Sequence, residues 1–109
     1  YTAFDGIGPP RVAVTCISVK DFLARRWKWK KPELITPSGV DDKDACIFPD
    51  KIRGKYLVLH RIGTDICADY LKSLDFKKEK VNKCIKIFGP RFDWTKSETR
   101  RFKESNSRK

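Results

Sequence analysis

The chain has 109 residues, enough for one small domain with a modest hydrophobic core. Its formal net charge is +11, which makes nucleic acid or an anionic surface one class of partner to weigh. No apolar run approaches the roughly 20 residues of a membrane-spanning helix, and one His beside four Cys with no Cys-x-x-Cys pair argues against a zinc site.

The first part of the chain predicts short strands separated by loops. Residues 1–5 read as a strand, and the Gly and Pro residues of 6–10 predict a rigid loop. Residues 11–19 carry apolar side chains on both faces, which predicts a strand buried between neighbours. We expect a helical turn or a wide loop at 21–29 and a loop at 32–42.

Residues 43–61, KDACIFPDKIRGKYLVLHR, are typical of two strands joined by a tight turn. The strands are expected at 45–52 and 55–61, with Arg53 and Gly54 between them. A two-residue connection that ends in Gly is a strong hairpin signal, because the second turn position needs a positive φ.

The ends of this hairpin carry basic residues. In an antiparallel pair, the start of one strand lies beside the end of the other, so Lys43 and Arg61 are expected to approach each other. Two cations at one strand end form a candidate anion site. A rim of solvated charges is the alternative. We expect Asp42, Asp44 and Asp50 to cap turns or to pair with nearby Lys.

Two further strands are predicted at 65–71 and 81–88, before Gly89 and Pro90. Short strands with turn signals every eight to twelve residues indicate an all-β sandwich, barrel or propeller. Residues 95–109 have no periodicity and almost no apolar content, so we expect a disordered or weakly helical tail.

The cysteines and two tryptophans each allow two interpretations. Free thiols are the preferred one for the cysteines, because each lies in an apolar strand-like run, but a disulfide stays open; the four are Cys16, Cys46, Cys67 and Cys84. Trp27 and Trp29 lie among basic residues and resemble a patch that stacks bases or sugars. The preferred interpretation is that they pack a loop onto the fold.

Three stretches of the chain resemble blocks of glycoside hydrolase family 130, the mannoside phosphorylases: YTAFDGIGPPRVAV, KDACIFPDKIRGKYLVLHRI and KIFGPRFDW. They occur in the family's order. The resemblance implies a five-bladed β-propeller, of which residues 1–94 would form about two blades. Residues 95–109 depart from the family's pattern. The absence of Met and the strand-like opening favour a piece of a longer protein.

The resemblance also implies roles for four residues. Asp5 matches the proton donor, Lys43 and Arg61 match phosphate-binding positions, and His60 is assigned to substrate contact. A phosphorylase needs one carboxylate rather than two, because phosphate itself is the nucleophile and needs a cationic cradle. A general acid must be protonated at the working pH, so Asp5 is expected to have a pKa raised by burial.

The activity implied is phosphorolysis of β-linked manno-oligosaccharides, with inversion, to α-mannose 1-phosphate. The expected partners are manno-oligosaccharide and inorganic phosphate as co-substrate, without metal, organic cofactor, nucleic acid or membrane; a homo-oligomer stays open. The expected location is cytoplasmic. The alternatives are a β-mannosidase of the same family and a basic module for single-stranded nucleic acid. Because two open blades leave unpaired edges, the isolated chain is expected to be inactive.

Overall fold

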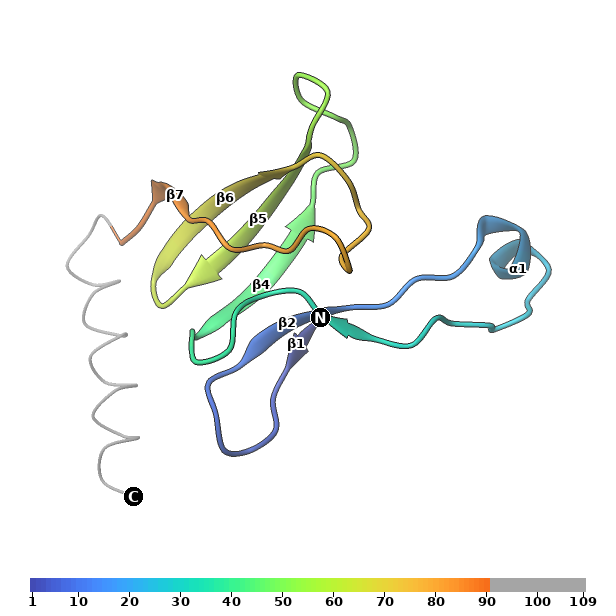
Figure 1. The fold of residues 1–109 in the computed structure, drawn as a ribbon, viewed down its shortest axis with the longest axis horizontal. Helices are drawn as coiled ribbons and strands as arrows, with labels where there is room; N and C mark the ends of the chain where they lie inside the picture. Colours follow the sequence, from blue (N-terminus) through green and yellow to red (C-terminus); the bar gives the residue numbers. More distant parts are fainter. Residues whose placement is uncertain (91–109) are drawn as a thin grey trace.

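A computed structural model describes residues 1–90, so the tail predicted at 95–109 lies outside the described residues. The described part is mostly β, as the turn spacing predicted, with two antiparallel sheets and one short helix (Figure 1). The sheets have the orders β1-β2-β3 and β4-β5-β6-β7. The elements are β1 (Thr2–Ala3), β2 (Arg11–Val14), α1 (Val19–Leu23), β3 (Glu33–Leu34), β4 (Asp42–Ile47), β5 (Tyr56–Ile62), β6 (Asp65–Leu71) and β7 (Ile85–Phe88). Within residues 1–90, no helix is long and apolar enough to cross a membrane.

The hairpin turn predicted between β4 and β5 is confirmed. Arg53 and Gly54 both have positive φ, at 50° and 75°. Ile52 and Lys55 flank them and exchange N–H···O bonds of 2.8 and 3.1 Å. Two left-handed residues in a two-residue loop are the geometry of a type I′ turn, whose twist matches that of the paired strands.

Strand β4 begins and ends earlier than predicted. It pairs with β5 from Asp42 onward and ends at Ile47, whereas the pattern predicted a strand at 45–52. Pro49 has no N–H to donate, so the ladder stops just before it. The register shifts between Lys43 and Cys46, and Asp44 has a φ of 53°, which marks a β-bulge.

Strand β6 has the bounds that were predicted, but β7 is shorter than the predicted strand at 81–88. The chain before β7 is held by side chains rather than by a strand ladder. The backbone N–H groups of Asn82 and Lys83 both donate to Oδ2 of Asp69, each at 3.1 Å. Val81 donates its N–H to the carbonyl of Ile35, which lies beyond the other sheet's last strand.

Strand β2 ends at Val14, well before the end of the strand predicted at 11–19. The chain then leaves the sheet as an arm, residues 15–32, which carries α1 and returns to β3 (Figure 1). The loop predicted at 32–42 therefore contains a short strand. Residues 11–12 pair with β1 and residues 13–14 pair with β3, so the ladder covers only the first four residues of the predicted strand.

One hydrophobic core joins the two sheets. Its members come from β2, from the residue after β3, from β5 and β6, and from the segment between β6 and β7: Val12, Ile35, Val58, Leu71, Phe76 and Val81. Each is nearly inaccessible to solvent. Burial of these side chains stabilises the contact between the sheets, since each fully buried large apolar residue contributes about 1.5–3 kcal/mol.

The preferred interpretation of the cysteines is wrong for two of them. Cys67 on β6 and Cys84 before β7 form a disulfide, while Cys16 and Cys46 are free and exposed. The sequence pattern placed Cys84 inside a strand. In the structure it lies in the segment that crosses β6, which brings the two sulfur atoms together.

Candidate functional site

Lys43 and Arg61 lie directly opposite each other across β4 and β5. The antiparallel register that follows from the type I′ turn and the bulge places them there, so the predicted approach of these two residues is confirmed. Directly opposed residues on an antiparallel pair have Cβ atoms about 4.5–5.5 Å apart. Two positive charges are therefore fixed at one end of the hairpin.

Each of these cations has a carboxylate partner on the same chain. Nζ of Lys43 lies 3.3 Å from Oδ1 of Asp41. Nε of Arg61 donates to Oδ2 of Asp44 at 2.8 Å, and Nη1 donates to the carbonyl of Gly63 at 3.2 Å. The Asp44 carboxylate is exposed, whereas Oδ1 of Asp41, which faces Lys43, is inaccessible to solvent. Exposed ion pairs contribute only about 0–1 kcal/mol, but an anion that binds here must displace both carboxylates.

Asp5 lies in a tight turn after β1. Its Oδ1 accepts the N–H groups of Ile7 and Gly8, both at 2.9 Å. These two bonds favour the ionised carboxyl and hold the pKa of Asp5 below its ordinary value. The side chain is exposed, whereas the expected role as a general acid needed a pKa raised by burial. In residues 1–90 nothing covers this carboxyl.

A shallow cavity of about 270 Å³ opens beside Asp5. Its wall also includes Pro9, Arg11 and Ser38, but neither of the two opposed cations lines it. The guanidinium of Arg11 donates to the carbonyl of Thr36, so it is already engaged. The structure thus joins Lys43 to Arg61 but does not bring Asp5 into a common pocket with them.

His60 occupies the opposite face of β5 from Arg61, because successive strand residues point to opposite faces. It is buried, with Nδ1 within 2.8–2.9 Å of both carboxylate oxygens of Asp42 and Nε2 2.9 Å from the carbonyl of Lys83. Both ring nitrogens thus have protein partners. The ring therefore lies on the buried face of the hairpin, and it does not face Lys43 and Arg61.

Asp42 is a residue that the sequence pattern misplaced. It was expected to cap a turn or pair with a Lys, yet it is buried against His60. Burial raises the pKa of Asp42, and the nearby His60 opposes that rise. Little in the sequence signalled this contact, because Asp42 was placed in the loop predicted at 32–42, outside the strands predicted at 45–52 and 55–61.

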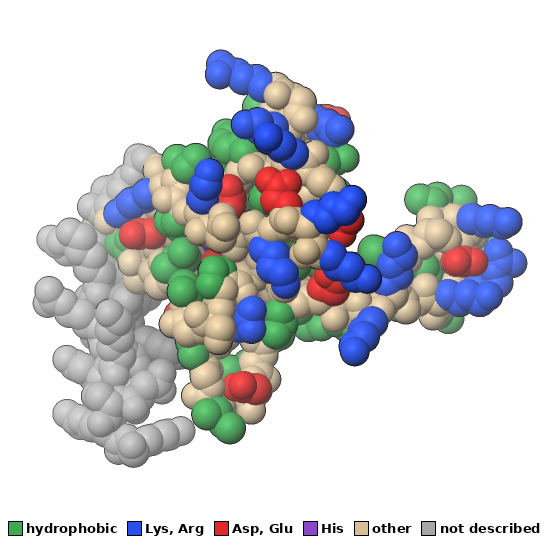
Figure 2. All heavy atoms as spheres, viewed as in Figure 1, with side chains coloured by type: hydrophobic (Ala, Val, Ile, Leu, Met, Phe, Trp, Pro, Cys, Tyr) green, Lys and Arg blue, Asp and Glu red, His purple; other side chains and the backbone are tan. Residues whose placement is uncertain are grey.

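The arm presents aromatic and basic side chains to solvent. Trp27 and Trp29 are 60% and 54% exposed, so the interpretation that they pack onto the fold is wrong. The ring of Phe22 contacts Trp27 edge to face, with centroids 5.7 Å apart. Figure 2 shows basic side chains gathered on the arm; its basic residues are Lys20, Arg25, Arg26, Lys28, Lys30 and Lys31. The arm projects away from the two sheets (Figure 1).

Within the described residues, no group of three His, Cys, Asp or Glu side chains is placed to hold a metal ion. Comparison of the chain with models of protein families, with curated proteins and with solved structures gave no match. The resemblance to glycoside hydrolase family 130 therefore rests on the three sequence blocks alone.

Proposed function

We propose that this chain is part of a mannoside phosphorylase that resembles glycoside hydrolase family 130. The observation that carries the proposal is the direct opposition of Lys43 and Arg61 across β4 and β5. These are the two positions that the sequence resemblance assigns to phosphate. A planar guanidinium beside a flexible ammonium suits the oxygens of one phosphate group.

The arrangement of the second sheet supports the same proposal. Strands β4, β5, β6 and β7 form a four-stranded antiparallel meander in chain order, which is the composition of a β-propeller blade. The smaller sheet of β1, β2 and β3 supplies part of a second blade in this proposal. Residues 1–94 would then be about two blades of a five-bladed β-propeller.

In the proposed reaction, inorganic phosphate attacks the anomeric carbon of a β-mannoside while Asp5 protonates the departing oxygen. Phosphate replaces Asp41 and Asp44 as the partner of the two cations, which orient it for in-line attack with inversion. No metal or organic cofactor takes part. An exposed Asp5 stays ionised at neutral pH, so the proposal requires further protein to cover it, and it predicts that this chain alone is inactive.

The test is the release of α-mannose 1-phosphate from β-1,2- and β-1,4-mannobiose, by this chain and by a longer protein that contains it. We expect release only by the longer protein and only with phosphate. Lys43→Ala and Arg61→Ala should each raise the KM for phosphate, while Lys72→Ala, at an exposed position, should not. Release without phosphate would identify a β-mannosidase instead, and no release by either protein would overturn the proposal.

The cellular location is a separate part of the proposal. A cytoplasmic enzyme was expected together with free thiols. The Cys67–Cys84 disulfide speaks against that location, because stable disulfides are typical of oxidising compartments. Alkylation of the chain at the moment of cell lysis tests the point: four alkylated cysteines indicate a reducing compartment, and two indicate an oxidising one.

A second candidate function is the binding of single-stranded nucleic acid by the arm. The observation that favours it is the exposure of Trp27 and Trp29 among basic residues, since aromatic rings stack on bases and cations track the phosphates. Binding of an oligonucleotide should weaken steeply with salt and should be lost in the Trp27→Ala/Trp29→Ala variant. Absence of binding at low salt would remove this candidate.

A further inference from the structure

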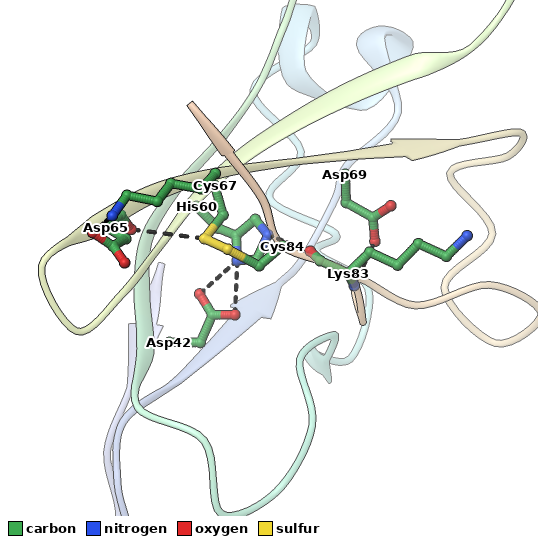
Figure 3. Close-up of a disulfide and its surroundings, with 8 residues drawn as sticks. Asp42, His60, Asp65, Cys67, Asp69, Lys83 and Cys84 are labelled. Atoms are coloured by element: carbon green, nitrogen blue, oxygen red, sulfur yellow. Dashed lines mark hydrogen bonds and ion pairs between the residues drawn. A yellow bond between two sulfur atoms is a disulfide. The ribbon is translucent and has the colours of Figure 1, made fainter. Parts of the chain in front are cut away.

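Three neighbouring strands carry a carboxylate, an imidazole and a sulfur in a row on their buried face (Figure 3). Asp42 on β4 contacts Nδ1 of His60 on β5 at 2.8–2.9 Å. His60 is the direct cross-strand partner of Cys67 on β6. Opposed residues of an antiparallel pair project from the same face of the sheet, so the imidazole and the sulfur lie side by side.

Residues 82–84 close over this row. The carbonyl of Lys83 accepts from Nε2 of His60 at 2.9 Å, and Cys84 is bonded to Cys67. Oδ2 of Asp69 accepts the N–H groups of Asn82 and Lys83. One covalent bond and three hydrogen bonds thus converge on three consecutive residues. The covalent bond and the hydrogen bond to the imidazole are on adjacent residues, so loss of one loosens the other.

We propose that the Cys67–Cys84 disulfide is a redox modification site, opened by a dithiol reductant, and that its reduction releases the Lys83 carbonyl and exposes Nε2 of His60. The two cysteines differ in the way that such a reaction needs. Cys84 is exposed and open to attack, whereas Cys67 is fully buried. The inference stands on this cluster alone and does not depend on the carbohydrate chemistry.

The reaction is thiol–disulfide exchange. A thiolate of the reductant attacks the sulfur of Cys84, the Cys67–Cys84 bond breaks, and its electron pair leaves on the sulfur of Cys67. That sulfur takes up the proton that the attacking thiol released when it formed its thiolate. The second thiol of the reductant then attacks the mixed disulfide and frees Cys84. In sum, two electrons and two protons pass from the dithiol to the chain, and the reductant becomes a disulfide.

The opening is local, because other contacts hold the preceding residues in place. Val81 is fully buried and donates its N–H to the carbonyl of Ile35 at 2.9 Å. Phe76, earlier in the same segment, belongs to the core that joins the sheets. Reduction therefore removes the covalent tether of residues 82–84 and leaves them held by the two hydrogen bonds to Asp69, while Val81 anchors the chain before them and the pairing of β7 with β6 anchors the chain after them. The imidazole of His60 loses its cover without loss of the β-sheet beneath it.

His60 is the only histidine of the chain, so its exposure can be read without interference from another imidazole. The oxidised chain and the chain reduced with dithiothreitol are treated with diethylpyrocarbonate, and modification of the imidazole is followed by ultraviolet absorbance. We expect the reduced chain to react at least ~10-fold faster, as for a site protected by a closed local structure. The Cys67→Ala/Cys84→Ala variant should react fast with or without the dithiol.

Circular dichroism of the same samples separates a local opening from unfolding. The proposal expects the β-sheet signal of the reduced chain to match that of the oxidised chain. Equal rates of imidazole modification in the two redox states would overturn it. Loss of the β-sheet signal on reduction would overturn it as well, because the disulfide would then be a structural cross-link. The imidazole nitrogen resonances of His60 offer a second readout, which should change on reduction if Nε2 loses its carbonyl partner.

Discussion

Asp42 and His60 form a hydrogen-bonded pair in the interior of the protein. Nδ1 of His60 lies within 2.8–2.9 Å of both carboxylate oxygens, and each side chain is 1% exposed. The other ring nitrogen faces the carbonyl of Lys83 at 2.9 Å. Because a carbonyl oxygen can only accept, Nε2 donates to Lys83, and Nδ1 shares one proton with the carboxyl group of Asp42. Two titratable groups are thus enclosed together.

Loss of the imidazole from this pair should destabilise the fold. His60→Gln leaves the buried carboxyl group of Asp42 without its partner, and an unsatisfied buried polar group costs about 1–3 kcal/mol. The double variant Asp42→Asn/His60→Gln should lose less than His60→Gln alone, because it also removes the unpartnered carboxyl group. Urea unfolding measures both.

The matched control is an exposed ion pair on the same sheet. Nζ of Lys86 lies 3.0 Å from Oδ1 of Asp65, and both side chains reach solvent. Lys86→Gln should cost at most about 1 kcal/mol. Equal losses for His60→Gln and Lys86→Gln would contradict the account of the buried pair.

Asp42 should also set a pH dependence of stability. Burial raises its pKa above the ordinary value of 3.8 that applies to the unfolded chain. The fold therefore holds this proton more tightly than the unfolded chain, so the stabilisation that this group contributes is fully present below about pH 3.8 and is lost as the pH rises through the folded pKa. The unfolding free energy of the wild type relative to Asp42→Asn should fall over that window. A rise over the same window would contradict the prediction.

Phe22 and Phe76 offer a comparison of the same residue type in two settings, the helix α1 and the turn region after β6. Each follows an Asp whose backbone N–H donates to the Oγ of a nearby Ser. Yet Phe76 is 7% exposed in the core, and Phe22 is 51% exposed on the arm. Phe76→Ala should cost about 3–5 kcal/mol, and Phe22→Ala less than about 1 kcal/mol. Thermal or urea unfolding of the two variants measures these changes in the free energy of unfolding. Similar losses in both variants would contradict the placement of Phe76 in the core.

The type I′ turn can be improved at one position and damaged at the next. Arg53 has a φ of 50°, which strains a residue with a long side chain, so Arg53→Asn should stabilise by about 0.5 kcal/mol. Gly54→Ala should destabilise by about 1 kcal/mol. A Cβ at Gly54 meets no atom within 4 Å, so this loss comes from the backbone alone. Chemical unfolding of the two variants shows whether the free energy of unfolding rises for Arg53→Asn and falls for Gly54→Ala.

The features predicted correctly from the sequence are local ones. The turn at Arg53 and Gly54 depends on two adjacent residues, and the strand at 65–71 on a short β-prone run between turn signals. In an antiparallel pair the start of one strand lies beside the end of the other, which is why the approach of Lys43 and Arg61 was predictable. The register itself was not, because counting from the turn pairs Lys43 with Thr64, and irregularities in the first strand shift it to Arg61. No tertiary contact is needed for any of these inferences.

The features that were missed depend on contacts between distant parts of the chain. The disulfide joins cysteines 17 residues apart and requires the segment before β7 to cross β6. The burial of His60 depends on the carbonyl of Lys83, which no side-chain pattern encodes. Trp27 and Trp29 look like core residues by type, but an arm that leaves the sheet gives them nothing to pack against. The exposure of Asp5 was missed for the same reason: burial of its turn would require a distant segment to cover it, and none does within residues 1–90.

The disulfide between Cys67 and Cys84 also closes the intervening chain into a covalent ring. A protease that cuts at an exposed Lys inside this ring, such as Lys77 or Lys78, opens the ring but leaves both fragments joined. Such a nicked molecule keeps its mass on a non-reducing gel and separates into two bands only after reduction. A single cut in the backbone between Cys67 and Cys84 therefore does not separate the protein into two molecules.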